Sequence, residues 1–138
     1  MRKNEILLDT HILLWSLADN PQLSAKAKSI IMDEKNRLYY STVSLLEIEM
    51  KHIAKPNQIH ASAKEVLAYC QDSGAFELID MTLNDILSLH QLKRKADTPP
   101  HKDPFDQLLL TQALNNDLKF MTHDFLITGY DVDNIIHV

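Results

Sequence analysis

The chain has 138 residues, of which 45% are hydrophobic and 24% charged, and it carries a formal net charge of -5. This composition excludes a disordered chain, and the length predicts one domain that spans residues 1–138. The acidic balance argues against a protein that coats nucleic acid through a basic surface. It leaves room for an enzyme that binds phosphates through divalent cations held in an acidic site.

Other features of the sequence exclude further classes. A single cysteine, Cys70, cannot form an intramolecular disulfide, which fits a reducing compartment. Only two glycines occur, so the glycine-rich loops that bind nucleotide phosphates are absent. The apolar run near the N-terminus is interrupted by Asp9 and His11, so it predicts neither a signal peptide nor a membrane span. We therefore expect a cytoplasmic protein.

Hydrophobic periodicity and breaker residues predict an alternation of strands and helices. In chain order we expect a strand at 6–8, helices at 10–18 and 24–35, a strand at 37–41, helices at 43–55 and 61–72, a strand at 76–79, a helix at 82–93, a basic loop at 93–102, a helix at 103–116, and strands at 119–122 and 134–138. The strands read as short apolar runs, as strands covered on both faces do. The pattern indicates an α/β fold with a mainly parallel sheet.

Two aspartates stand just after predicted strands. Asp9 follows the first strand directly, and Asp124 comes two residues after the strand at 119–122. Ligands of open parallel sheets bind at the carboxyl ends of the strands, so both side chains are candidates for a site there. Each also has an ordinary structural interpretation, Asp9 as the N-cap of the next helix and Asp124 as a turn residue.

Further acids belong to the starts of predicted helices. Glu47 comes three residues after Ser44, which is the spacing of a capping box. Asp103 precedes Pro104, as expected of an aspartate N-cap followed by proline in the first helical position. These patterns can be explained by helix formation alone.

Asp106 is harder to explain in this way. The helix dipole favours an acid in the first turn. However, Asp106 shares a helix face with Leu109 and Leu110, which we expect to be buried. An acid at the end of a buried stripe points toward a cleft.

A doubly wound sheet would bring several of these carboxylates to one edge. Two carboxylates 4 Å apart repel each other by roughly 1 to 4 kcal/mol, so a group of them needs cations to stay ionised. Oxygen ligands favour Mg²⁺ or Mn²⁺ over zinc, and the seven histidines show no HExxH pairing. The acids together therefore indicate a divalent metal site more strongly than any one of them does alone.

Four sequence blocks, at residues 7–15, 41–48, 101–109 and 122–124, carry a family resemblance. Together they make the chain similar to PIN-domain ribonucleases, specifically the VapC-like toxins of type II toxin–antitoxin systems. The resemblance implies a three-layer α/β/α domain with a mainly parallel five-stranded sheet. It also implies a metal-dependent endoribonuclease that uses Mg²⁺ or Mn²⁺ and has an acidic site at the carboxyl edge of the sheet.

Residue by residue, the resemblance assigns the catalytic positions to Asp9, Glu47, Asp106 and Asp124. Of these, Asp9, Asp106 and Asp124 would hold the metal and orient a water for attack on the phosphodiester, while Glu47 would be a ligand or a base. Asp103 would lie beside them, and Thr122 would be a polar supporting residue.

Two positions depart from the pattern of such toxins. Leu46 stands where tryptophan is frequent, and Gln107 stands where arginine is frequent. The first change affects packing, whereas the second removes a cation near the acids.

Basic side chains near the loop at 93–102 are candidates for substrate binding, with a solvated surface as the structural alternative. They are Lys93, Arg94, Lys95 and Lys102, with Lys51 and Lys55 as further candidates. By resemblance the substrate is RNA, and an exposed loop of a structured RNA such as tRNA or rRNA fits the usual mode of RNA recognition. The resemblance also implies a cognate antitoxin that covers the site, and a homodimer.

Two other functions remain open at this level. The chain could be a PIN-like fold that has lost activity and only binds partners, which missing ligands would mark. A phosphoacceptor receiver domain is also α/β and acidic at its strand ends, but it needs a lysine at the end of a late strand. Lys119 precedes its strand instead.

Overall fold

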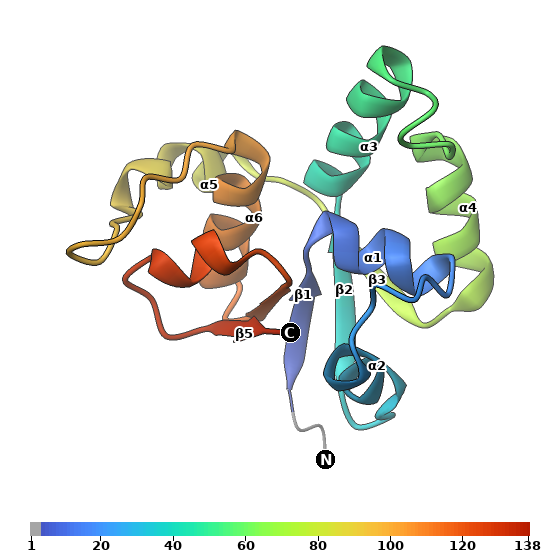
Figure 1. Cartoon of the computed structure of the whole chain (residues 1–138), viewed down its shortest axis with the longest axis horizontal. Helices are drawn as coiled ribbons and strands as arrows, with labels where there is room; N and C mark the ends of the chain where they lie inside the picture. Colours follow the sequence, from blue (N-terminus) through green and yellow to red (C-terminus); the bar gives the residue numbers. More distant parts are fainter. Residues whose placement is uncertain (1–3) are drawn as a thin grey trace.

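The structure is a computed structural model that describes residues 4–138, so residues 1–3 lie outside the described part of the chain. Strands and helices alternate along most of the chain (Figure 1). The strands are β1 (Glu5–Leu8), β2 (Arg37–Ser41), β3 (Phe76–Ile79), β4 (Lys119–Thr122) and β5 (Ile135–His137). The α-helices are α1 (Thr10–Leu17), α2 (Ala25–Met32), α3 (Thr42–Ala54), α4 (Ala63–Ser73), α5 (Leu83–Leu87) and α6 (Pro104–Asn115), and the 3-10 helices are η1 (Leu89–Gln91) and η2 (Phe125–Gly129).

The five strands form one parallel sheet in the order β3-β2-β1-β4-β5. In its register Leu8 lies beside Met121, and Thr122 lies beside His137. The residues that follow β1, β4 and β5 therefore meet at one edge of the sheet. The sequence-based prediction of a parallel five-stranded α/β fold is confirmed.

Apolar side chains of the strands point alternately to two cores. Ile6 and Leu8 pack in a core that includes residues of α1, α2 and α4. Leu7 and Phe120 point the other way, into a core that includes α6 and η2. These two cores on opposite faces give the expected three layers. Among the described residues, no helix is long and apolar enough to cross a membrane.

Most helix boundaries follow the sequence signals. Ser24 caps α2 and Gly74 ends α4 in the left-handed conformation, at φ 65°. Thr82 and Asp85 form the capping box of α5, as predicted. Asp103 caps α6 by accepting hydrogen bonds from backbone amides of the first turn.

Three local predictions were wrong. The helix expected at 82–93 stops at Leu87 and continues as η1, and the Ser88 hydroxyl donates a 2.6 Å hydrogen bond to the Asn84 carbonyl at this break. Helix α2 ends at Met32, before an Asp33 turn, rather than at residue 35. The helix η2 was not predicted, because its five residues are too short for a periodic pattern.

Candidate active site

Asp9 lies at the end of β1 and caps α1, so its structural and its functional interpretations are compatible. Its Oδ1 accepts a 2.7 Å hydrogen bond from the Thr10 amide, and its Oδ2 accepts a 2.6 Å bond from the Thr122 hydroxyl. The side chain is buried. Burial, opposed by these hydrogen bonds, raises the pKa of Asp9 to about 6. The nearby Glu47 carboxylate acts in the same direction as burial.

Glu47 projects from α3 and is also buried. Its Oε2 accepts a 2.5 Å hydrogen bond from Lys51, one helical turn further on. Its Oε1 is buried and has no hydrogen-bond partner among the described residues. A buried carboxylate oxygen without a donor is unfavourable, and a cation would satisfy it.

The capping-box interpretation of Glu47 was wrong. Helix α3 begins at Thr42, and its N-cap is Ser41, whose hydroxyl accepts from the Val43 amide at 3.0 Å. Ser44 is already inside the helix, where its hydroxyl accepts a 2.9 Å bond from the Thr10 hydroxyl. Glu47 is therefore not needed to form the helix.

Lys51 is the cation nearest to Glu47. Burial lowers the pKa of Lys51, but its hydrogen bond to Glu47 and the charges of Asp103 and Asp106 outweigh burial, and the net shift is upward. Lys51 therefore supplies a positive charge beside the acids. Gln107, which stands where arginine is frequent in the family, supplies none.

Asp106 has the most strongly perturbed carboxyl of the group. Its side chain is 12% exposed. Burial and then the charges of Asp9, Asp103, Glu47 and Asp124 raise its pKa to about 8. Four carboxylates are thus close enough to affect Asp106, and three of them, Asp9, Glu47 and Asp124, are far from it in the sequence. The convergence predicted from the sequence is present in the structure.

Asp124 completes this group from the end of β4. Its backbone amide donates to the Thr122 hydroxyl at 3.0 Å, and its Oδ1 accepts from the Leu126 amide at 2.9 Å. Thr122 therefore contacts both strand-end aspartates, because the same hydroxyl donates to Asp9. This geometry matches the supporting position expected of Thr122.

His101 was missing from the predicted site. Its Nε2 lies 3.3 Å from Asp106 Oδ2 and 3.8 Å from Asp124 Oδ2. One ligand atom from each of these three residues can be chosen so that all lie within 4.8 Å of one another. No periodicity or cap signal marks a histidine in an irregular loop, although His101 does begin the third family block.

The other nitrogen of His101 contacts Tyr130. Nδ1 lies 2.7 Å from the Tyr130 hydroxyl, which also accepts a 3.2 Å bond from the Gln107 amide. The same amide donates to the His101 carbonyl at 3.1 Å. Gln107 therefore orients the histidine and the tyrosine rather than pairing with an acid as an arginine would.

The predicted basic residues lie in different environments. Arg94 donates a 2.7 Å hydrogen bond to the Leu126 carbonyl, also bonds the Pro99 carbonyl, and lies over the Tyr130 ring. These contacts tie the loop to η2 and give Arg94 a structural role. Exposed side chains are found at Lys93, Lys95, Lys102 and Lys55. Substrate binding by any of these residues stays a prediction.

The donors in this site fit a divalent cation. The carboxylates of Asp9, Glu47, Asp106 and Asp124 supply oxygen ligands and excess negative charge, and Glu47 Oε1 is a buried acceptor without a donor. His101 adds a nitrogen ligand, which Mn²⁺ accepts more readily than Mg²⁺. The site therefore has the donors to hold a divalent cation.

Comparison with solved structures gives full-length fold matches at low sequence identity. A VapBC2 complex from Rickettsia felis bound to a DNA fragment from its promoter matches with a TM-score of 0.63 and 13% identity, covering 97% of each chain. A toxin–antitoxin complex from Klebsiella pneumoniae matches at 0.59 and 15%, covering 95% of each chain. VapBC-1 from nontypeable Haemophilus influenzae matches at 0.59 and 15%, covering 96% of this chain and 97% of that one.

Comparison with curated protein sequences gives no match. The PIN domain family model matches residues 6–129, which include β1 to η2 and every acid described above. This match covers most of the chain and confirms the resemblance read from the four sequence blocks. The chain belongs to the PIN domain family.

Proposed function

We propose that this protein is a metal-dependent endoribonuclease and the toxin of a toxin–antitoxin pair. PIN domains are generally nucleases, and this chain has the fold across its full length. One observation carries the proposal, namely that ligand atoms of His101, Asp106 and Asp124 lie within 4.8 Å of one another, with the carboxylates of Asp9, Glu47 and Asp103 close enough to act on Asp106. Such a concentration of buried negative charge suits a cation and a phosphodiester substrate better than a purely structural role.

Asp9, Asp106 and Asp124 would hold the cation, which is Mg²⁺ or Mn²⁺, and Glu47 and His101 are further ligand candidates. When bound, the cation supplies charge neutralisation at the scissile phosphate and lowers the pKa of water. The chain's own residues set the geometry. The Thr122 hydroxyl orients Asp9, and Asp103 orders the first turn of α6 on which Asp106 stands.

Lys51 and Glu47 form an ion pair, and both side chains belong to α3. Lys51 holds one oxygen of Glu47, which leaves Oε1 either to bind the cation or to accept a proton from an attacking water. Across the site, the Tyr130 hydroxyl can donate to Nδ1 of His101. The histidine then carries its proton on Nε2, facing Asp106. Burial lowers the pKa of His101, which favours this neutral form.

The partners are proposed on separate grounds. The solved structures named above are described as toxin–antitoxin complexes, and this supports a cognate antitoxin for this chain. RNA as substrate, with tRNA or rRNA as candidates, and a homodimer rest on the family resemblance. A domain that only binds partners is the competing function, although every family acid is present here.

The proposal is tested by incubating the protein with structured RNA and Mn²⁺, with and without EDTA, beside Asp9→Asn. We expect cleavage that EDTA abolishes and that Asp9→Asn reduces at least about 100-fold, because the variant loses a charged ligand. The readout is the rate of appearance of cleaved ends on a denaturing gel.

Asp80→Asn is the matched control. Asp80 follows β3 as Asp9 follows β1, but it is exposed and lies at the outer strand of the sheet. Its substitution should leave the rate unchanged. Equal cleavage by wild type and Asp9→Asn would reject the mechanism, and a lack of cleavage of every RNA tested would favour the binding module.

A further inference from the structure

A row of aromatic and imidazole rings lies beside the acids and takes no part in the functions described above. It consists of His11, Trp15, His123, His137 and Phe125, which we call the ring strip. Neighbouring ring centroids are 5.4 to 6.4 Å apart, with Trp15 between His11 and His123, and His137 between His123 and Phe125. The strip therefore runs along the molecule as a continuous set of contacts.

The strip follows the carboxyl edge of the sheet, next to the acidic site. His11 comes two residues after Asp9, and His123 lies between Thr122 and Asp124. His137 is paired with Thr122 in the register of β4 and β5. A substrate phosphate bound at the acids would thus place its neighbouring nucleotides within reach of these rings.

Several of these rings are both exposed and held in place. His11, His123 and His137 are exposed, and Phe125 is 73% exposed. His123 Nδ1 lies 2.7 Å from the Val138 carbonyl, and His137 Nε2 lies 3.2 Å from the His123 carbonyl. These two hydrogen bonds hold the His123 and His137 rings, which therefore lose little conformational freedom when a flat ligand stacks on them.

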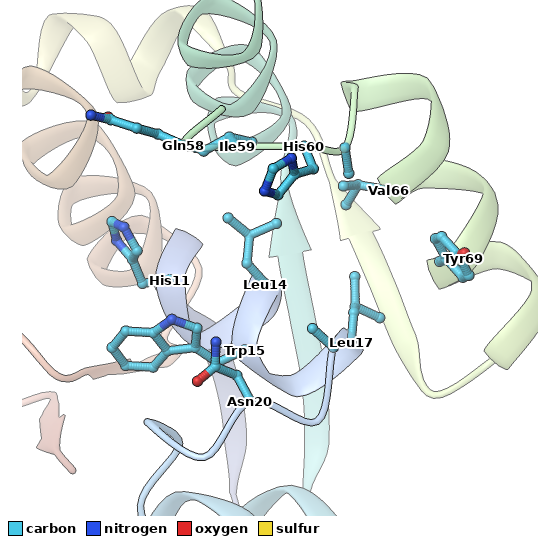
Figure 2. Close-up of a pocket in the computed structure, with 12 residues that line it drawn as sticks. His11, Leu14, Trp15, Leu17, Asn20, Gln58, Ile59, His60, Val66 and Tyr69 are labelled. Atoms are coloured by element: carbon cyan, nitrogen blue, oxygen red, sulfur yellow. The ribbon is translucent and has the colours of Figure 1, made fainter. Parts of the chain in front are cut away.

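Trp15 also forms one wall of a hollow of about 380 Å³. Figure 2 shows His11 and Trp15 of α1 on one side of the hollow, and Val66 and Tyr69 of α4 on the other. The polar lining includes the amides of Asn20 and Gln58. Much of the remaining lining is aliphatic, and a nucleobase face could pack against it beside Trp15; these side chains are Leu14, Leu17, Ile59 and Val66.

We propose that the ring strip binds unpaired bases of the RNA substrate, with Trp15 as its central stacking surface. The proposal rests on RNA being the substrate, and it adds that bases flanking the cleaved phosphate must be unpaired. The charge of the protein points the same way. At a net charge of -5, the overall charge of the protein does not attract the RNA backbone, so stacking would add affinity that this charge does not provide.

The chain contains one tryptophan, so its indole fluorescence reports on this strip directly. Binding is measured in EDTA, which prevents cleavage, with three probes of about 12 nucleotides. They are a single-stranded RNA, an abasic RNA of the same length, and the corresponding duplex. We expect the single strand to quench the indole emission and to bind at least about 10-fold more tightly than the abasic and duplex probes.

Two exposed rings can be removed without touching the core. His123→Ala and Phe125→Ala should each weaken binding of the single strand about 5-fold or more, because each removes a stacking face. Met32→Ala is the matched control, since Met32 is 79% exposed at the C-terminal end of α2 and is not part of the ring strip. It should bind as the wild type does.

Equal affinity for the abasic probe, absence of binding, or unchanged affinity in both ring variants would overturn the proposal. RNA binding without any change in indole emission would also overturn it, and would leave the hollow to an apolar peptide. The nuclease proposal fails separately. If single-stranded RNA binds and quenches the indole emission but is not cleaved in Mn²⁺, the ring-strip proposal stands and the nuclease proposal fails. If RNA is cleaved without quenching, only the nuclease proposal stands.

Discussion

Two buried carboxylates lie at opposite ends of α6 and are treated very differently by the fold. Near its C-terminal end, Asp85 accepts a 2.8 Å hydrogen bond from the Asn115 amide on one oxygen and a 2.8 Å bond from the Thr82 backbone amide on the other. At the N-terminal end, Asp106 faces four other carboxylates and the His101 ring. Both oxygens of Asp85 have hydrogen-bond donors within the protein, whereas Asp106 lies mainly among other carboxylates.

The difference separates a structural acid from a functional one better than burial does. Asp85 is 1% exposed and is the more deeply buried of the two. Its partners are neutral donors that fix α5 against α6, so the carboxylate stabilises the fold. Asp106 is surrounded by carboxylates that disfavour its ionised form, so a bound cation would stabilise it.

The largest expected effect comes from removing the charge of Asp106. Asp106→Asn should lower RNA cleavage in Mn²⁺ at least about 100-fold, because it removes a ligand of the cation. In EDTA, the same variant should melt at a temperature no lower than that of the wild type, because repulsion among the acids is relieved. Gel assays and thermal melts measure the two effects.

Mn²⁺ provides the internal control for this variant. It should raise the melting temperature of the wild type and have a smaller effect on Asp106→Asn, since binding to the folded state alone stabilises it. A variant that is less stable in EDTA and keeps its full rate would show that Asp106 is a structural acid like Asp85.

Removing the carboxylate of Asp85 should instead lower stability and leave activity unchanged. Asp85→Ala leaves the Asn115 amide and the Thr82 amide without their acceptor, and should lower the free energy of unfolding by about 1–3 kcal/mol. Urea denaturation measures this loss. The cleavage rate per folded molecule should not change. A lower rate with unaltered stability would show that Asp85 is not a purely structural acid.

The smallest expected effect is a pH dependence of stability in the metal-free protein. Folding raises the pKa of Asp106 to about 8 and that of Asp9 to about 6, so the folded state binds protons that the unfolded chain releases. The stability that these protons provide is present at low pH and is lost as the pH rises through the folded pKa values. The lowered pKa of His101 acts oppositely only at more acidic pH.

In EDTA, the melting temperature should therefore fall between about pH 7 and about pH 9, by a few degrees. Asp106→Asn should flatten this slope, whereas Asp80→Asn should keep it. A melting temperature that rises across this interval in the wild type would show that the Asp106 carboxyl is ionised in the folded state at neutral pH.

The sequence was sufficient to predict the sheet and the two strand-end aspartates because both follow from local patterns, whereas Glu47 was placed in the site by the family resemblance. Apolar runs that end in an aspartate mark the strand ends at Asp9 and Asp124, and parallel topology then brings them together. His101 and Lys51 depend on tertiary placement. A loop histidine has no periodicity, and the pairing of Lys51 with Glu47 matters only because α3 turns both toward the site. The break at Ser88 likewise depends on a side chain competing for backbone hydrogen bonds.

The junction between β2 and α3 has a consequence for how this protein can evolve or be redesigned. The strand ends at Ser41 and the helix begins at Thr42, with no loop residue between them. The sheet therefore sets the rotational phase of α3. Each residue inserted or deleted at this junction would turn Glu47 by about 100° around the helix axis, away from the other acids. Length variation and inserted tags belong in surface turns such as the one between α2 and β2, which carries no residue of the site.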